Sequence, residues 1–169
     1  MIRGRAVRDA VEGWVRLPTL VLGVGNSLRG DDAVGPLVCA RVDGPRAVDC
    51  GDAPERYLGL AGEEWVGRVL LVDAVDFGGE VGEVVFCTSD ELVERFGTTH
   101  DSGLALLTRF LEKAYGTPTA LLGVQPGNTS FGAQVSAVVL AAVDEIASWL
   151  TVAASQRKPG EVETAWTRS

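Results

Sequence analysis

The stretch over residues 19–35, TLVLGVGNSLRGDDAVG, constrains the fold more than any other part of the sequence. Its apolar beginning is followed by closely spaced glycines, including Gly23 and Gly25, and then by two adjacent carboxylates, Asp31 and Asp32. Apolar residues at helical spacing resume after the acids. This order predicts a buried strand, a tight turn, an acidic pair beyond the carboxyl end of the strand and the start of a helix. In open α/β sheets, sites form at that end of the strands.

The alternation of apolar runs and helical patterns continues along the chain. A continuous apolar run over residues 69–75, interrupted only by Asp73, predicts a strand buried on both faces. Because strands alternate with helices, the sequence predicts an α/β protein of three layers, α/β/α, with a mostly parallel sheet of about five strands. The expected strands span residues 20–24, 46–50, 69–75, 80–87 (antiparallel at an edge) and 119–124, and the expected helices span residues 6–15, 33–42, 55–60, 92–96, 104–114 and 134–150.

One domain accounts for most of the chain, since 169 residues are enough for one full hydrophobic core. No internal repeat or low-complexity segment divides it. We expect an N-terminal extension over residues 1–17, a single α/β domain over residues 18–152 and a polar C-terminal tail over residues 153–169.

The composition excludes several classes of protein. With 46% hydrophobic and 22% charged residues, the chain is not a disordered polypeptide. Its net charge of −8 argues against nucleic-acid and anionic-membrane partners, whose phosphates it would repel. No apolar run approaches the roughly 20 residues of a membrane span, and the mixed charges near the start do not fit a signal peptide. Three cysteines without CxxC spacing, Cys39, Cys50 and Cys87, favour a reducing compartment, so we expect a cytoplasmic protein.

Three features are candidates for chemistry: the pair Asp31 and Asp32, Asp73 near the end of its strand, and His100, the single histidine. Two carboxylates and an imidazole can coordinate a borderline divalent ion such as nickel or zinc. Each also has a structural interpretation, in which the acidic pair caps a helix, Asp73 bonds to backbone amides and His100 lies on the solvated surface. Their placement after strands or before helices favours a site.

A second hypothesis comes from the glycine spacing. Gly23 and Gly25 after a strand are similar to loops that bind dinucleotides or S-adenosylmethionine. However, the third glycine, Gly30, follows Gly25 by five residues instead of three. Asp31 and Asp32 would also oppose a pyrophosphate at the helix start. A nucleotide- or S-adenosylmethionine-binding enzyme is therefore the less favoured alternative.

Four segments together resemble the hydrogenase maturation endopeptidases. They are GVGNSLRGDDAVG (residues 23–35), LLVDAVDFG (70–78), THDSGL (99–104) and LLGVQP (121–126), and the resemblance extends over roughly residues 20–150. It implies a twisted sheet between helices. It also implies a peptidase that removes a short C-terminal peptide from the large-subunit precursor of a nickel–iron hydrogenase after nickel has been inserted.

The resemblance further implies roles for individual residues. Asp32, Asp73 and His100 correspond to the side chains that contact the nickel of the precursor and act in catalysis. No resident cofactor is expected, because the substrate supplies the nickel. The resemblance also implies supporting roles for Gly23, Gly25, Asn26 and Asp31. The role of Asp31 is expected to be structural.

The chemistry that this set implies is aspartyl- and metal-dependent hydrolysis. The nickel of the substrate would act as a Lewis acid or lower the pKa of a bound water, with one carboxylate as base. The expected partner is the precursor, without nucleic acid or membrane, and the protein is expected to be a monomer. A non-catalytic nickel-binding maturation module would use the same ligands and is the main alternative. Residues 49–52 read Asp-Cys-Gly-Asp where the family usually has an Asp-Gly-Gly-Thr-like turn, a departure that bears on precursor choice.

Overall fold

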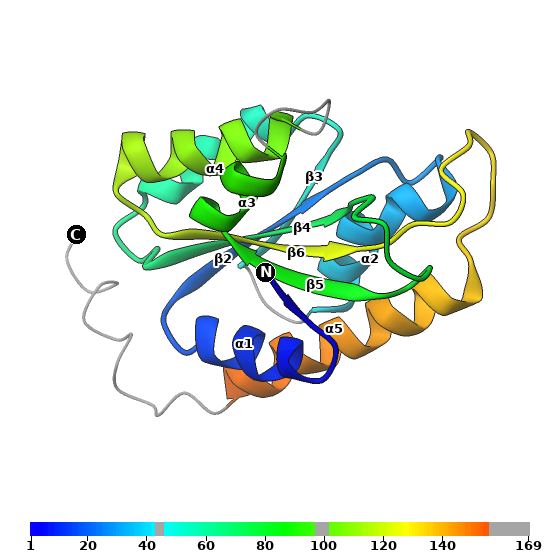
Figure 1. Cartoon of the computed structure of the whole chain (residues 1–169). Helices are drawn as coiled ribbons and strands as arrows, with labels where there is room; N and C mark the ends of the chain where they lie inside the picture. Colours follow the sequence, from blue (N-terminus) through cyan, green and yellow to red (C-terminus); the bar gives the residue numbers. More distant parts are fainter. Residues whose placement is uncertain (43–45, 97–101, 156–169) are drawn as a thin grey trace.

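A six-stranded sheet lies at the centre of the structure, a computed structural model that describes residues 1–42, 46–96 and 102–155 (Figure 1). Its strands are β1 (Ile2–Arg3), β2 (Thr19–Val24), β3 (Ala47–Gly51), β4 (Arg68–Ala74), β5 (Val84–Thr88) and β6 (Thr119–Val124). They are ordered β1-β5-β6-β4-β2-β3. The neighbours from β6 to β3 are parallel, whereas β5 is antiparallel to both β6 and β1.

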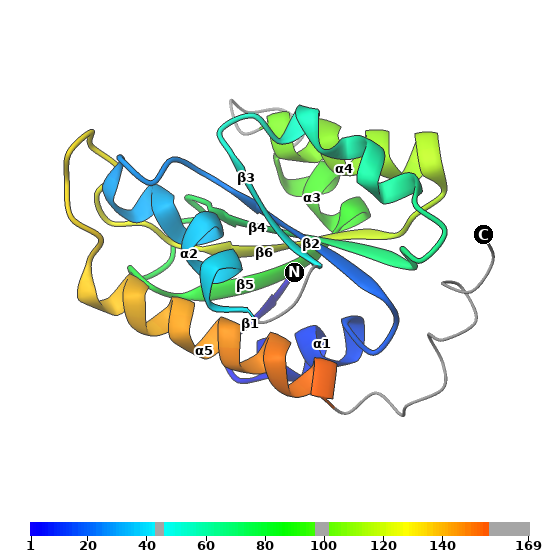
Figure 2. The same ribbon diagram turned by 180° about the vertical axis from the view of Figure 1, so that it is seen from behind.

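Helices cover both faces of the sheet, as Figures 1 and 2 show from opposite sides. One face packs against α1 (Ala6–Trp14), α2 (Val34–Arg41) and α5 (Ala137–Ser155), and the other against α3 (Ser89–Phe96) and α4 (Ser102–Tyr115). Alternate strand positions supply the two apolar clusters between the layers, with Val21 in one and Leu20 in the other. This three-layer arrangement confirms the predicted fold class. Among the described residues, no helix combines the length and apolar character needed to cross a membrane.

The structure differs from the sequence-based expectations in several elements, among them β5, which begins at Val84 instead of residue 80, and α3, which begins at Ser89 instead of residue 92. β1 adds a strand beside β5 that was not predicted, because two residues are too few to show a periodic pattern. The helix expected over residues 55–60 is a pair of short 3-10 helices, Pro54–Arg56 and Leu58–Gly62. Gly59 and Gly62 in this segment disfavour a regular α-helix. α5 begins at Ala137 instead of residue 134, and Ser136, a residue type favoured at the N-cap, precedes it and accepts the N–H of Leu140 at its carbonyl.

The first helix is part of the core. The side chains of Val7, Val11 and Val15 lie on one face of the segment and are buried in the same cluster as the strands. Trp14 meets Phe86 of β5 edge to face, with 5.6 Å between ring centroids. Residues before β2 therefore cover part of one face of the sheet.

Two glycines, Gly23 and Gly35, allow the backbone of α2 to pack directly against the backbone of the sheet. A Cβ on Gly35 would lie 2.2 Å from the carbonyl oxygen of Val24 and 2.6 Å from that of Val72. A Cβ on Gly23 would lie 2.3 Å from the carbonyl oxygen of Gly35. No side chain fits at such distances, so both positions require glycine for the close approach. The approach fixes the start of α2 at the carboxyl ends of β2 and β4.

We expect Gly35→Ala to lower the free energy of unfolding by about 2 kcal/mol or more, because the added methyl group forces α2 away from β2. The matched control is Gly13→Ala, also within a helix, where a Cβ meets nothing within 4 Å. This control should leave stability unchanged or raise it by up to about 1 kcal/mol. Urea unfolding of both variants measures the difference, and equal effects would contradict the importance of this contact.

Candidate functional site

The carboxyl ends of β2, β4 and β6 meet at one edge of the sheet, because these strands are parallel neighbours. The connection from β2 to α2 holds Asp31 and Asp32 in a short 3-10 helix, Gly30–Ala33. Asp73 is the last residue but one of β4. The fold therefore brings the predicted carboxylates to one edge of the sheet. His100, the third residue of the predicted set, lies outside the described residues.

Asp31 is fully buried and its carboxylate is an anchor for a distant loop. Its Oδ1 accepts hydrogen bonds from the backbone N–H and the hydroxyl of Ser136 at 2.7 and 2.9 Å. Its Oδ2 accepts from the N–H groups of Gly127 and Asn128 at 2.8 and 3.0 Å, and from the Ser136 hydroxyl at 3.0 Å. The backbone N–H of Asp31 in turn donates to the carbonyl of Asn128. These bonds hold the loop of residues 125–136, between β6 and α5, against the acidic turn.

The hydrogen bonds to Asp31 also fix its charge state. Burial by itself would raise the pKa of this carboxyl group, but the donors from Ser136, Asn128 and Gly127 outweigh burial and hold the pKa below its ordinary value. Asp31 is thus an ionised side chain in the protein interior. Its position favours the structural interpretation, in which it supports the turn that carries Asp32.

The backbone of Asp32 and the carboxylate of Asp73 both lie close to Gly25. Asp32 is half-buried, and its Oδ2 accepts a hydrogen bond from the backbone N–H of Asn26 at 2.9 Å. Asp73 is buried, and its Oδ1 accepts from the N–H of Ala74 at 2.8 Å. Gly25 has a φ of +130°, and a Cβ there would lie 1.9 Å from the carbonyl oxygen of Asp32 and 3.7 Å from Oδ1 of Asp73. A side chain at Gly25 would therefore collide with the acidic turn and occupy the space before Asp73.

Comparisons with known proteins agree with this architecture. The family described as HycI, hydrogenase maturation protease, matches residues 41–153. The hydrogenase 3 maturation protease of Escherichia coli K12 is 36% identical over 118 residues, which covers 66% of this chain and 75% of that protein. The chain belongs to the hydrogenase maturation protease family.

Two solved structures of hydrogenase maturation proteases share the fold. The crystal structure of the [NiFe] hydrogenase maturation protease HycI from Thermococcus kodakarensis aligns with a TM-score of 0.77 at 28% identity, covering 86% of this chain and 99% of that one. The solution structure of the endopeptidase HycI from Escherichia coli aligns with a TM-score of 0.70 at 31% identity, covering 80% and 90%. Membership in the hydrogenase maturation protease family confirms the predicted resemblance and the predicted enzyme class, a peptidase.

A nucleotide-binding enzyme, part of the less favoured alternative from the glycine spacing, does not fit the turn after β2. In a phosphate-binding loop, backbone N–H groups point at the ligand. Here the N–H of Asn26 donates to the carboxylate of Asp32, and the N–H groups of Leu28 and Arg29 donate to the side-chain and backbone oxygens of Asn26. These donors are already used within the turn, so they cannot cradle a phosphate.

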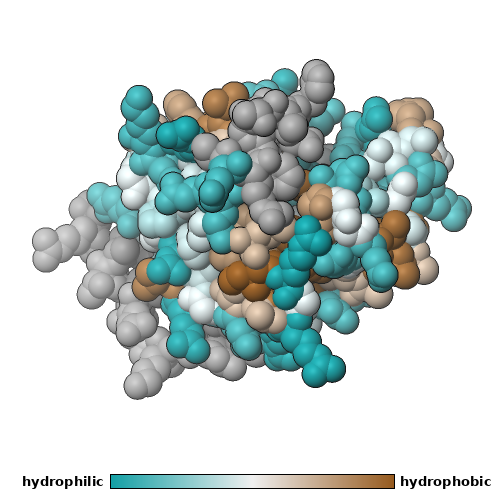
Figure 3. Space-filling view, in the orientation of Figure 1, coloured by the Kyte–Doolittle hydropathy of each residue, from teal (hydrophilic) through white to brown (hydrophobic). Residues whose placement is uncertain are grey.

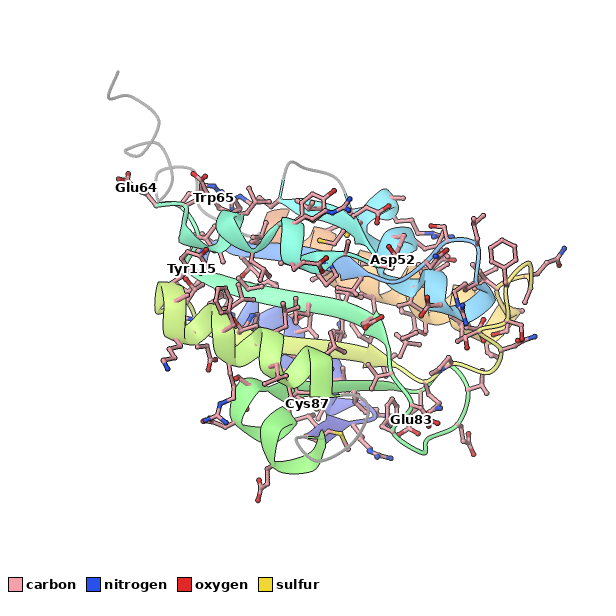
Figure 4. All side chains as sticks on the ribbon, turned by 90° about the horizontal axis from the view of Figure 1, so that it is seen from above. Asp52, Glu64, Trp65, Glu83, Cys87 and Tyr115 are labelled. Carbon is pink, nitrogen blue, oxygen red and sulfur yellow. The ribbon has the colours of Figure 1, made fainter. Side chains whose placement is uncertain are left out.

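Asp52 is a neighbour of the site that sequence reasoning missed. The pairing of β2 with β3 shifts after Gly23, and the backbone N–H of Gly25 bonds to the carbonyl of Gly51 at 2.9 Å. Asp52, labelled in Figure 4, follows directly. Its Oδ2 accepts from the side-chain amide of Asn26 at 3.3 Å. The signal in the sequence was the departure of residues 49–52 from the family pattern, which places an acid here.

Gln125 is a second residue whose role was missed, although it lies within the segment LLGVQP. Its side chain is 7% exposed and forms four hydrogen bonds. Oε1 accepts from the N–H groups of Phe77 and Gly79, and Nε2 donates to Asp76. The amide of Gln125 lowers the pKa of Asp76. Gln125 thus fixes the loop that follows Asp73.

The described residues can supply part of a metal site. Within residues 1–42, 46–96 and 102–155, no three side chains of His, Cys, Asp or Glu form a group that could hold an ion. Asp32 and Asp73 provide carboxylate oxygens at the edge of the sheet, and carboxylates suit divalent cations when a third donor completes the set.

We expect Asp31→Asn to lower the free energy of unfolding at neutral pH by about 2 to 4 kcal/mol, because an amide cannot accept all the hydrogen bonds of the buried carboxylate. Since the pKa of Asp31 is lowered in the folded state, its ionised form stabilises the protein above about pH 4, and this stabilisation is lost as the pH falls through the folded-state pKa. Urea unfolding from pH 7 to pH 3 should show the gap between wild type and variant narrowing.

Asp144→Asn is the control for this experiment. Asp144 is exposed and pairs with Arg41 across the surface at 2.7 Å. Exposed ion pairs contribute about 1 kcal/mol at most, so this variant should remain within that range at neutral pH. A constant gap between wild type and Asp31→Asn at every pH would contradict the charge state assigned to Asp31.

Proposed function

We propose that this protein removes a C-terminal peptide from the nickel-loaded large-subunit precursor of a nickel–iron hydrogenase. Membership in the hydrogenase maturation protease family supports the proposal, as do relatives named hydrogenase 3 maturation protease and [NiFe] hydrogenase maturation protease HycI. The observation that carries it is that Asp32 and Asp73 both lie close to Gly25, at the carboxyl edge of the parallel strands.

In this proposal Asp32 and Asp73 contact the nickel carried by the substrate, and His100 completes the set. Oδ2 of Asp32 already accepts the N–H of Asn26, which orients the carboxylate and leaves its other oxygen for the ion. The N–H of Ala74 orients the carboxylate of Asp73. The protein needs no cofactor of its own, because the metal arrives with the precursor.

The proposed chemistry is hydrolysis of a peptide bond by a water activated at the substrate's nickel. A divalent ion polarises a carbonyl and lowers the pKa of a bound water, and a nearby carboxylate accepts the proton. In this proposal one carboxylate of the set, Asp32 or Asp73, serves as this base. We further propose that the protein acts in the cytoplasm as a monomer.

Processing of a candidate precursor tests the function directly. With purified precursor, loaded or not loaded with nickel, the large subunit should lose a C-terminal peptide only when nickel is present, as followed by intact mass. Asp32→Asn, Asp73→Asn and His100→Ala should each lower kcat/KM by about a hundredfold or more, because each removes a contact to the ion at the reacting bond.

Asp90→Asn is the control, since Asp90 is an exposed acid on α3. It should process the precursor at the wild-type rate. A wild-type rate for Asp32→Asn would exclude the proposed mechanism. Nickel-dependent binding of the precursor without cleavage would instead indicate a non-catalytic maturation module.

A further inference from the structure

Four large apolar side chains are exposed around the loop between β6 and α5. They are Leu28 (62% exposed), Val81 (43%), Phe131 (75%) and Val138 (53%), and we call them the loop patch. Burying such side chains is favourable, and contiguous exposed apolar surface marks sites of interaction. Figure 3 shows apolar surface at the end of the molecule where this loop and the start of α5 lie.

The backbone segments that carry the loop patch lie close to one another. The backbone N–H of Gly132, next to Phe131, donates to the carbonyl of Leu28 at 2.7 Å. At the base of the same loop, a Cβ on Gly127 would lie 3.1 Å from a methyl group of Val81. A Cβ on Gly82 would lie 3.3 Å from Cβ of Val138. The patch thus extends along the loop from the acidic turn to the first turn of α5.

The loop patch is continuous with the candidate site. Leu28 lies in the turn that carries Asp32, and its backbone N–H donates to the side chain of Asn26 at 2.9 Å. Asp31 holds both ends of the loop, through Gly127 and Asn128 at one end and Ser136 at the other. A buried carboxylate therefore fixes the exposed apolar residues relative to the acidic turn, which suits recognition by loops on a rigid scaffold.

We propose that the loop patch binds apolar side chains of the hydrogenase large-subunit precursor and places its C-terminal segment over Asp32 and Asp73. This inference rests on the proposed function. Leu28 shares the turn of residues 25–32 with Asp32, and Gly132, next to Phe131, bonds to the carbonyl of Leu28, so a polypeptide seated on this part of the loop patch lies next to the acidic turn. Burying Leu28 and Phe131 against the precursor would also remove bulk water from around the turn that carries Asp32, while the water bound at the substrate's nickel remains as the nucleophile.

The test is to measure binding and cleavage separately with the full chain. The probe is the nickel-loaded large-subunit precursor from the organism that encodes this protein. The double variant Leu28→Ser, Phe131→Ser should raise Kd and KM at least about tenfold. It should leave kcat within about twofold of wild type, because the carboxylates are untouched. The matched control is Leu106→Ser, Phe110→Ser on α4, where the same residue types are 67% and 50% exposed. Thermal unfolding checks that both variants fold.

The outcomes separate this proposal from the proposed function. Equal Kd and KM values for the two double variants would show that the precursor does not dock at the loop patch. The proposed peptidase function would be unaffected by that result. Precursor that binds through the patch but remains uncut would overturn the proposed function and leave the docking surface in place. A wild-type dimer that the Leu28→Ser, Phe131→Ser variant converts to a monomer, with precursor affinity unchanged, would identify the patch as an interface between copies of this chain.

Discussion

The buried carboxylate of Asp31 joins the parts of the structure on which the site depends. An ionised group in the interior is costly unless hydrogen bonds satisfy its oxygens. Here the donors come from Gly127, Asn128 and Ser136, which lie 96, 97 and 105 residues later in the chain. The acidic turn and the loop before α5 therefore stabilise each other. Neither can move alone without leaving a buried charge or buried N–H groups unsatisfied.

Local geometry gives two adjacent aspartates different environments. Asp31 and Asp32 lie in a 3-10 helix, where about three residues complete a turn and successive side chains point roughly 120° apart. When Asp31 points into the protein, Asp32 must point elsewhere, and its carboxylate lies beside Asn26 at the edge of the sheet. The sequence left helix capping and ligand contact open for both residues. The backbone conformation separates them, since one is enclosed by donors and the other is half-buried.

Much of the fold could be predicted, because strong local patterns determine it. The apolar run around Asp73 identified β4, and its alternation with helical segments identified a parallel sheet, which places Asp32 and Asp73 at one edge. Asp52 and Gln125 were missed because their partners are distant in sequence. The contact of Asp52 with Asn26 follows a shift in strand register, and Gln125, just after β6, bonds to Phe77 and Gly79 in the loop after the neighbouring strand β4. Such contacts depend on tertiary geometry, which hydrophobic periodicity does not encode.

The way Asp31 is stabilised also shapes the electrostatics at this edge. Its hydrogen-bond donors are neutral backbone and hydroxyl groups, which stabilise the negative charge without cancelling it. Arg29, the cation of the same turn, is exposed, so solvent screens its charge. The charges of Asp31 and Asp32 therefore add where β2 ends, and a buried charge acts through a lower dielectric than an exposed one. Under the proposed function, a precursor that carries a divalent ion gains this attraction and an unloaded precursor does not. Selectivity for the loaded precursor can then arise from charge alone, without a conformational change in the protease.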